Sequence, residues 1–195
     1  MALAPRASDR DRTHRPELDG LRGVAVALVV AAHAGLPIPG AALGPDIFFV
    51  LSGYLIVGLL LRRLDSTGKI AFADFYARRF RRIVPAIAAA VGLTLLAIAL
   101  IGDPFLLAAT ALDGAASLVG ASNIRFGAQA IDYFAADQPS PLLPLWSIGV
   151  EEQFYLLVPL AIGVAYRIGG RRAVSRLLGV ALCLSAAAAI LATPS

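Results

Sequence analysis

The sequence predicts an all-α protein, a polytopic transmembrane helix bundle with about five spans, a partial or re-entrant segment and an interfacial amphipathic helix. The composition is 58% hydrophobic and 15% charged, with a mean hydropathy of +0.77, whereas soluble domains carry about 25% charged residues. Several apolar runs are long enough to cross a bilayer, and basic residues stand at their ends. The core is therefore expected to lie in lipid.

The net charge of +4 does not indicate a nucleic-acid partner. The basic residues gather at the ends of apolar runs instead of forming one polar face, and this pattern sets the orientation of a membrane protein. The single cysteine, Cys183, lies inside an apolar run. The sequence therefore predicts neither a disulfide framework nor a metal site.

The first apolar run, residues 20–36, is a membrane-span candidate at the short end of the usual range. The polar, arginine-rich residues 1–18 before it are expected to form a disordered cytoplasmic arm, and residues 19–195 the membrane domain. Ala32-His33-Ala34 also resembles a signal-peptide cleavage site, but the further apolar runs favour a span.

Arg22 and His33 are the two ionisable residues in this run. Their separation is close to three helical turns, so both fall on nearly one face of a helix. Ionisable groups inside a membrane are costly and by default indicate function. The alternative is that Arg22 snorkels to the boundary and His33 lies in the far headgroup layer.

The second span is predicted over residues 47–61, with Asp46 as its N-cap or as a functional carboxylate near His33. Ser52 stands beside a glycine, which suits either close helix packing or the lining of a substrate channel. At helical spacing, residues 70–82 place aromatic side chains on one face of a helix and basic side chains on the opposite face. This pattern predicts an amphipathic helix at the membrane interface. The basic side carries four arginines, Arg78, Arg79, Arg81 and Arg82.

The remaining spans are predicted over residues 83–101, 142–166 and 177–192. Residues 104–122 are apolar but interrupted, and we expect them to enter the membrane only partly. Arginines between 167 and 176 then fall on the cytoplasmic side, as the positive-inside bias prefers. This arrangement predicts a membrane protein with a cytoplasmic N-terminus.

Four stretches carry the chemistry, in the order RPELDGLRGVAVALVVAAH, PDIFFVLSGYLI, FYARRFRRIVP and LWSIGVEEQFYLLVP. In this order they resemble the membrane acyltransferase-3 family, whose members O-acylate bacterial surface sugars, peptidoglycan and some antibiotics. The resemblance covers roughly residues 15–166, and it implies a location in the bacterial inner (plasma) membrane. It implies a bundle of about ten membrane-crossing helices, of which this chain would supply the N-terminal half.

The resemblance also implies that an acyl group passes from cytoplasmic acyl-CoA to an acceptor hydroxyl. Arg22 and His33 match an Arg-then-His motif in which the histidine is essential. Glu151 matches the more dependable glutamate of the family's last motif, and Asn123 after Ser122 resembles a recurring Ser-Asn pair. The cytoplasmic arginine motif is matched by Arg78, Arg81 and Arg82.

The chemistry of these residues is consistent with such roles. Acyl transfer to a hydroxyl needs a base that titrates near neutrality, and we expect His33 to be that base. Glu151 is expected to hold the other ring nitrogen of His33, with Asp46 as the second candidate. Ser147, Glu151 and Tyr155 are spaced i, i+4, i+8 and share one helix face.

Glu152 points about 100° away from that face, and we expect it to pair with Arg22 or to face another cavity. Guanidinium groups match phosphate oxygens, so Arg78, Arg81 and Arg82 are candidates for binding the phosphates of CoA. The alternative is that they anchor the chain to anionic lipid. Where the family often has a histidine, two residues before the tryptophan, this chain has Pro144.

The sequence thus predicts an O-acyltransferase that moves an acetyl or other short acyl group to an exported glycan or similar acceptor. Acyl-CoA is expected as donor substrate, with acetyl-CoA the first candidate, and no permanently bound cofactor. The expected partners are the bilayer, the acceptor and the missing C-terminal half or another chain. One alternative is an inactive, truncated membrane protein or partner subunit. Another is proton-coupled transport, because intramembrane His and Glu also build proton relays.

Overall fold

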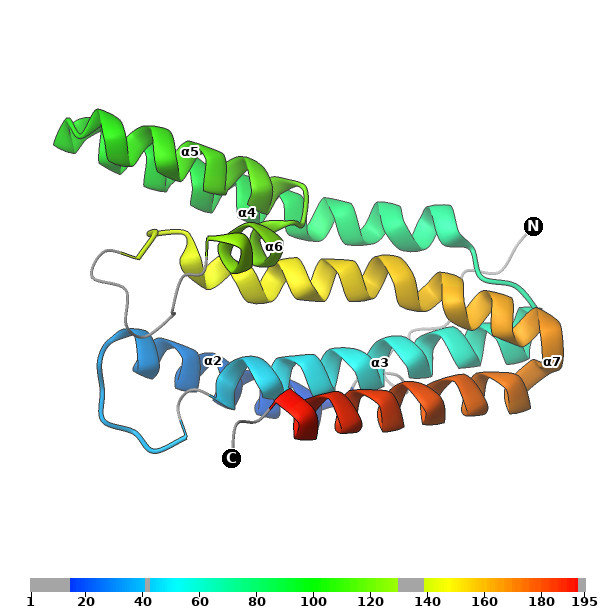
Figure 1. Ribbon diagram of the computed structural model, residues 1–195. Coiled ribbons are helices and arrows are strands. Elements are labelled where there is room, and N and C mark those ends of the chain that lie inside the picture. Colours follow the sequence, from blue (N-terminus) through cyan, green and yellow to red (C-terminus); the bar gives the residue numbers. More distant parts are fainter. Residues whose placement is uncertain (1–14, 41–42, 130–138, 193–195) are drawn as a thin grey trace. The chain divides into compact units, whose positions relative to one another are not determined.

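A computed structural model describes residues 15–40, 43–129 and 139–192, and within these ranges the chain is helical and contains no strand. This confirms the predicted all-α class (Figure 1). The chain divides into two compact units, Met1–Leu55 and Ile56–Ser195, each described below by itself. Most of the predicted N-terminal arm, residues 1–14, lies outside the described residues.

The first unit contains α2 (Pro16–His33) and the beginning of α3 (Gly44–Thr67). The helix α2 begins at Pro16 rather than at Gly20, because a proline suits the first turn of a helix and two acidic residues follow it there. The start of α3 packs closely on α2: a Cβ at Gly44 would lie 2.6 Å from Val29 Cγ2.

Asp46 was predicted as an N-cap but lies within the first turn of α3, because the helix begins at Gly44. Pro45 permits this early start, since its missing N–H would have no partner in the first turn anyway. The carboxylate still faces the positive end of the helix dipole from this position.

In the second unit, α4 (Phe72–Ile101) is one continuous helix of 30 residues. The sequence predicted two helices, with a boundary between Arg82 and Ile83, and that boundary is wrong. Alanine and arginine around it are strong helix formers, and Pro85 removes one backbone hydrogen bond without ending the helix.

The chain then turns at Gly102, which has a left-handed φ of 83°, and Asp103 caps α5 (Pro104–Leu118) through the backbone N–H of Leu106 at 2.9 Å. Figure 1 shows α5 running back along α4. A Cβ at Gly114 would lie 2.5 Å from Val91 Cγ1, so the two helices approach closely there. At 15 residues, α5 spans about 22 Å, which is less than the hydrocarbon thickness of about 30 Å and fits a partial entry.

Two short helices, α6 (Ser122–Ala128) and η2 (Leu143–Leu145), lead to α7 (Trp146–Ala192). The 47 residues of α7 are broken by non-helical backbone at Gly169 and Gly170, and Figure 1 shows the second arm turning back beside the first. Ile162 and Val174, one from each arm, are buried in one cluster with Leu60 and Leu64 of α3. The two arms correspond to the last two predicted spans.

Three helices within the described ranges are long and apolar enough to cross a membrane: Gly44–Thr67, Phe72–Ile101 and Leu143–Leu191. With the two arms of the last one, they correspond to four of the five predicted spans. The helix α2 is not among them and stays a predicted span, as it carries three charged residues in 18. Large apolar side chains are widely exposed, among them Leu100 and Ile168 at 81% each, as expected for a surface facing lipid.

Candidate functional site

A charged cluster joins α4 to α7 in the second unit, with Arg79 at its centre. The Nη2 atom of Arg79 lies 3.3 Å from Glu151 Oε1, and its Nε atom lies 3.6 Å from Glu152 Oε1. The three side chains are 16%, 24% and 27% exposed. One guanidinium therefore contacts two carboxylates that the sequence analysis assigned to separate partners.

Tyr155 completes this cluster from the same face of α7 as Glu151. Its ring lies under the Arg79 guanidinium, whose central carbon is 3.0 Å from the ring centroid, a cation–π contact. Its hydroxyl donates a hydrogen bond to Glu151 Oε1. The predicted i, i+4 polar face is thus a real contact between Glu151 and Tyr155. Ser147, the third member of that face, donates to the Pro144 carbonyl oxygen at 3.3 Å.

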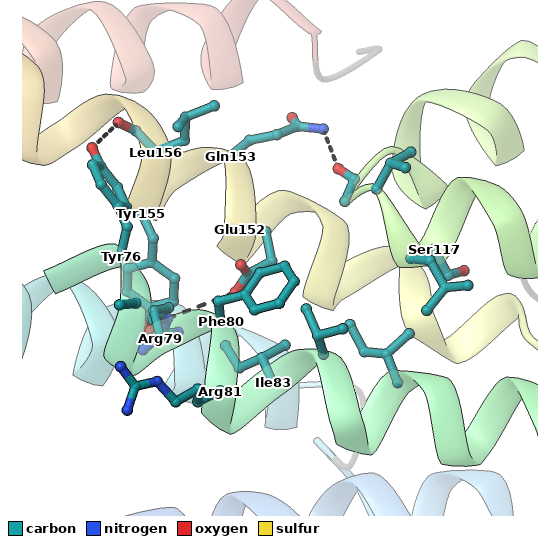
Figure 2. A pocket seen from close by; sticks show the side chains of 16 residues that line it. Tyr76, Arg79, Phe80, Arg81, Ile83, Ser117, Glu152, Gln153, Tyr155 and Leu156 are labelled. Carbon is teal, nitrogen blue, oxygen red and sulfur yellow. Dashed lines mark hydrogen bonds and ion pairs between the residues drawn. The ribbon is translucent and has the colours of Figure 1, made fainter. Parts of the chain in front are cut away.

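Aromatic residues of α4 hold this helix against α7 one turn away from Arg79. The hydroxyl of Tyr76 donates to the Leu156 carbonyl oxygen at 2.9 Å (Figure 2). Phe75 is buried next to the Tyr76 ring. Arg79 follows Phe75 by four residues and therefore shares its face. The sequence interpretation placed Arg79 on the opposite, basic side, which is wrong. The four-residue spacing from the buried Phe75 is the sequence feature that places Arg79 on the face of α4 toward α7.

A cavity of about 710 Å³ opens beside the cluster. Its polar lining includes Arg79, Arg81, Ser117, Glu152 and Gln153, and the rest of the lining is mainly apolar (Figure 2). The apolar lining comes from α4, from the connection after α5 and from α7, and includes Ile83, Val84, Ile87, Leu118, Val119 and Leu156.

Gln153 connects α7 to α6, and the sequence interpretation missed it. Its Nε2 atom donates to the Gly120 carbonyl oxygen at 3.0 Å and to Asn123 Oδ1 at 2.8 Å. Ser122 Oγ donates to the Leu145 carbonyl oxygen at 2.8 Å. The Ser-Asn pair noted in the sequence is therefore a packing point for α7. Gly149 permits the close approach, because a Cβ there would lie 2.7 Å from Ser122 Oγ.

A second ion pair missed in the sequence joins α5 to α6. Asp113 is 4% exposed, and its Oδ1 atom lies 2.5 Å from Arg125 Nε. The sequence interpretation treated Asp113 as an interruption of an apolar run. The signal that identifies the pair is the burial cost of a carboxylate in an apolar helix, which demands a cation nearby.

His33 is the last residue of α2, in the first unit. Its Nδ1 atom lies 2.7 Å from the Val29 carbonyl oxygen. A carbonyl can only accept, so Nδ1 carries the proton, and in the neutral ring the lone pair lies on Nε2. The Val29 carbonyl thus contacts the ring nitrogen of His33 that the sequence analysis expected Glu151 to hold. Since Glu151 belongs to the second unit, its pairing with His33 stays a prediction.

The other predicted site residues have separate surroundings. Arg22 Nη1 lies 3.4 Å from Asp19 Oδ1, one turn earlier on α2, and Ser52 is buried at 7% exposure in the first unit. Three arginines of α4 were predicted to bind CoA, and all three are exposed: Arg78, Arg81 and Arg82. Arg79, by contrast, is partly buried.

A comparison of the sequence with known proteins identifies its family. Residues 15–194 match the membrane acyltransferase family described as "Acyltransferase domain". The chain belongs to this family. Since the match covers the helices of both units, it confirms the resemblance that the four motifs gave.

Three bacterial proteins are similar to this chain. It is 40% identical over 148 residues to the O-acetyltransferase OatA of Staphylococcus aureus, and 38% identical over 156 residues to the peptidoglycan O-acetyltransferase OatA of Listeria monocytogenes. It is 40% identical over 160 residues to the putative peptidoglycan O-acetyltransferase YrhL of Bacillus subtilis. These matches cover 75%, 79% and 81% of the chain but 24%, 25% and 25% of the relatives, respectively. No solved structure matches the chain.

Proposed function

We propose that the chain serves in an integral-membrane O-acyltransferase that moves an acetyl or other short acyl group to a hydroxyl of an exported glycan. The observation that supports this most is the 38–40% identity to the three proteins named as O-acetyltransferases. Two of them are named for peptidoglycan, which makes peptidoglycan the first acceptor to test. The proposed setting is the inner membrane, with a cytoplasmic N-terminus.

His33 is the proposed base. The Val29 carbonyl lies 2.7 Å from Nδ1, so Nε2 is the ring nitrogen that would take the proton of the acceptor hydroxyl. The hydroxyl oxygen then attacks the thioester carbonyl, the C–O bond forms and the C–S bond breaks. The imidazolium returns its proton to the departing thiolate. In this scheme Glu151 stabilises the positive charge that forms on the ring.

Acyl-CoA is the proposed donor. Its phosphates carry several negative charges, and Arg78, Arg81 and Arg82 present exposed guanidinium groups on α4. Arg22 would add a cation at the cytoplasmic mouth of the site. The exposure of the three arginines is compatible with a role in binding lipid phosphates as well, so the donor has to be tested directly.

The test is an assay on the chain in proteoliposomes, with radiolabelled acetyl-CoA outside and a muropeptide acceptor supplied on either side. We expect label in the acceptor from the wild-type chain and none from His33→Ala, with equal membrane insertion. Transfer retained by His33→Ala would refute the proposed mechanism. A wild-type chain that inserts but transfers nothing, with or without a C-terminal half supplied, would favour the inactive membrane protein instead.

A further inference from the structure

We propose that Arg79 is a positioning residue that fixes Glu151 and Tyr155, and that it does not bind the phosphates of the donor. Its effect on catalysis rests on the proposed function, whereas its effect on the two side chains of α7 does not. The inference separates Arg79 from the three exposed arginines beside it in the sequence.

The first argument is that the guanidinium is already engaged on several sides. Nη2 contacts Glu151, Nε faces Glu152, and the flat face lies on the Tyr155 ring. A phosphate that approached Arg79 on the side of Nε and Nη2 would have to displace the two carboxylates, because the guanidinium donors lie in one plane.

The second argument is electrostatic. The side chain of Arg79 is 16% exposed, whereas Arg78 and Arg81 are exposed on the same helix. Two carboxylates face the one guanidinium of Arg79, so Arg79 offers an anion no net positive charge of its own. Placing a phosphate there would also require breaking an ion pair in partly buried surroundings, where an unpaired charge is costly.

The third argument concerns what Arg79 holds. Glu151 accepts from Tyr155 on its own helix, and Arg79 ties both side chains to α4. The two helices have a separate connection, in which the Tyr76 hydroxyl donates to the Leu156 carbonyl oxygen. Loss of the Arg79 side chain is therefore expected to release the carboxylate while leaving the helices packed.

The experiment compares Arg79→Gln, Arg79→Lys, Arg81→Gln and the matched control Arg172→Gln, which changes an exposed arginine outside the proposed site. For Arg79→Gln we expect kcat to fall by about tenfold to a hundredfold, as misplacement of a catalytic group does, while the KM for acetyl-CoA changes less than about twofold. Arg79→Lys, which keeps the charge, should restore kcat in part. Arg81→Gln should raise the KM instead, and Arg172→Gln should match the wild type.

Binding and stability measurements make the inference independent of turnover. Equilibrium binding of CoA should be unchanged by Arg79→Gln, and the effects of Arg79→Gln and Glu151→Gln on thermal unfolding should be non-additive. A raised KM or weakened CoA binding with kcat retained would overturn the inference, as would additive unfolding effects. A wild-type chain without transferase activity would refute the proposed function, while the double-mutant cycle would still decide whether Arg79 holds Glu151.

Discussion

The proposed base and the charged cluster of α4 and α7 are built in opposite ways. His33 is oriented by the carbonyl of Val29, four residues earlier on its own helix, and Arg22 pairs with Asp19 within the same helix. Arg79, by contrast, meets Glu151 across 72 residues of sequence. Contacts within a helix follow from its geometry alone, whereas contacts between helices depend on the packing that brings them together.

This difference predicts how the two regions respond to substitution. A substitution at His33 or its neighbours on α2 should lower acyl transfer and leave the fold intact, because these contacts lie within one helix. A change at a junction between helices should cost stability as well. The five substitutions below test this contrast, from the largest expected effect to the smallest.

His33→Ala should lower acyl transfer by about 10²- to 10⁴-fold, the contribution of a general base. Thermal unfolding of the chain in detergent should stay unchanged, because His33 lies at the exposed end of α2. A large loss of stability together with activity would show that His33 is structural, and the contrast between the two regions would then fail.

Asp113→Asn should destabilise the second unit by about 3 kcal/mol, since it removes the partner of a charge in a largely buried ion pair. Asp113 is 4% exposed and contacts Arg125 of the next helix. Chemical denaturation in detergent measures the change. A loss below about 1 kcal/mol, typical of a surface pair, would mean that water screens this junction.

Gly149→Ala should destabilise the chain by about 1 to 2 kcal/mol, because the added methyl group overpacks the junction with Asn123 and Ser122. Gly92→Ala is the matched control: nothing lies within 4 Å of a Cβ there, so it should stabilise α4 by up to about 1 kcal/mol. Equal effects of the two substitutions on thermal unfolding would refute the close approach at Gly149.

Tyr155→Phe should cost about 1 kcal/mol, because it removes the hydrogen bond to Glu151 and keeps the aromatic ring under Arg79. Transfer activity should fall moderately, since the carboxylate loses its hydrogen bond from Tyr155. Activity and stability equal to those of the wild type would show that this hydrogen bond does not fix Glu151.

Asp19→Asn should change stability by no more than about 0.5 kcal/mol, as is usual for exposed pairs within a helix. The side chains of Arg22 and Asp19 are 35% and 50% exposed. The same denaturation measurement that is used for Asp113→Asn gives a direct comparison. An effect as large as that of Asp113→Asn would remove the distinction between the two kinds of pair.

The sequence predicted features that depend on local geometry. The helical class and the i, i+4 contact of Glu151 with Tyr155 follow from hydropathy and helical periodicity, and the structure confirms both. The break predicted before Ile83 failed, because the change from basic to apolar residues marks a change of surroundings and does not end a helix. The role of Arg79 required knowledge of which face of α4 meets α7, and this is fixed by packing between distant segments.

The bend of α7 has a consequence for membrane topology. Gly170 has φ 59° and ψ −150°, a backbone conformation essentially restricted to glycine. As one straight rod, the 47 residues would extend about 70 Å, more than twice the hydrocarbon thickness of about 30 Å. With the bend, α7 returns toward the side from which it started. The two glycines at the bend therefore divide one long apolar helix into two arms, each with a length suited to a single crossing of the bilayer.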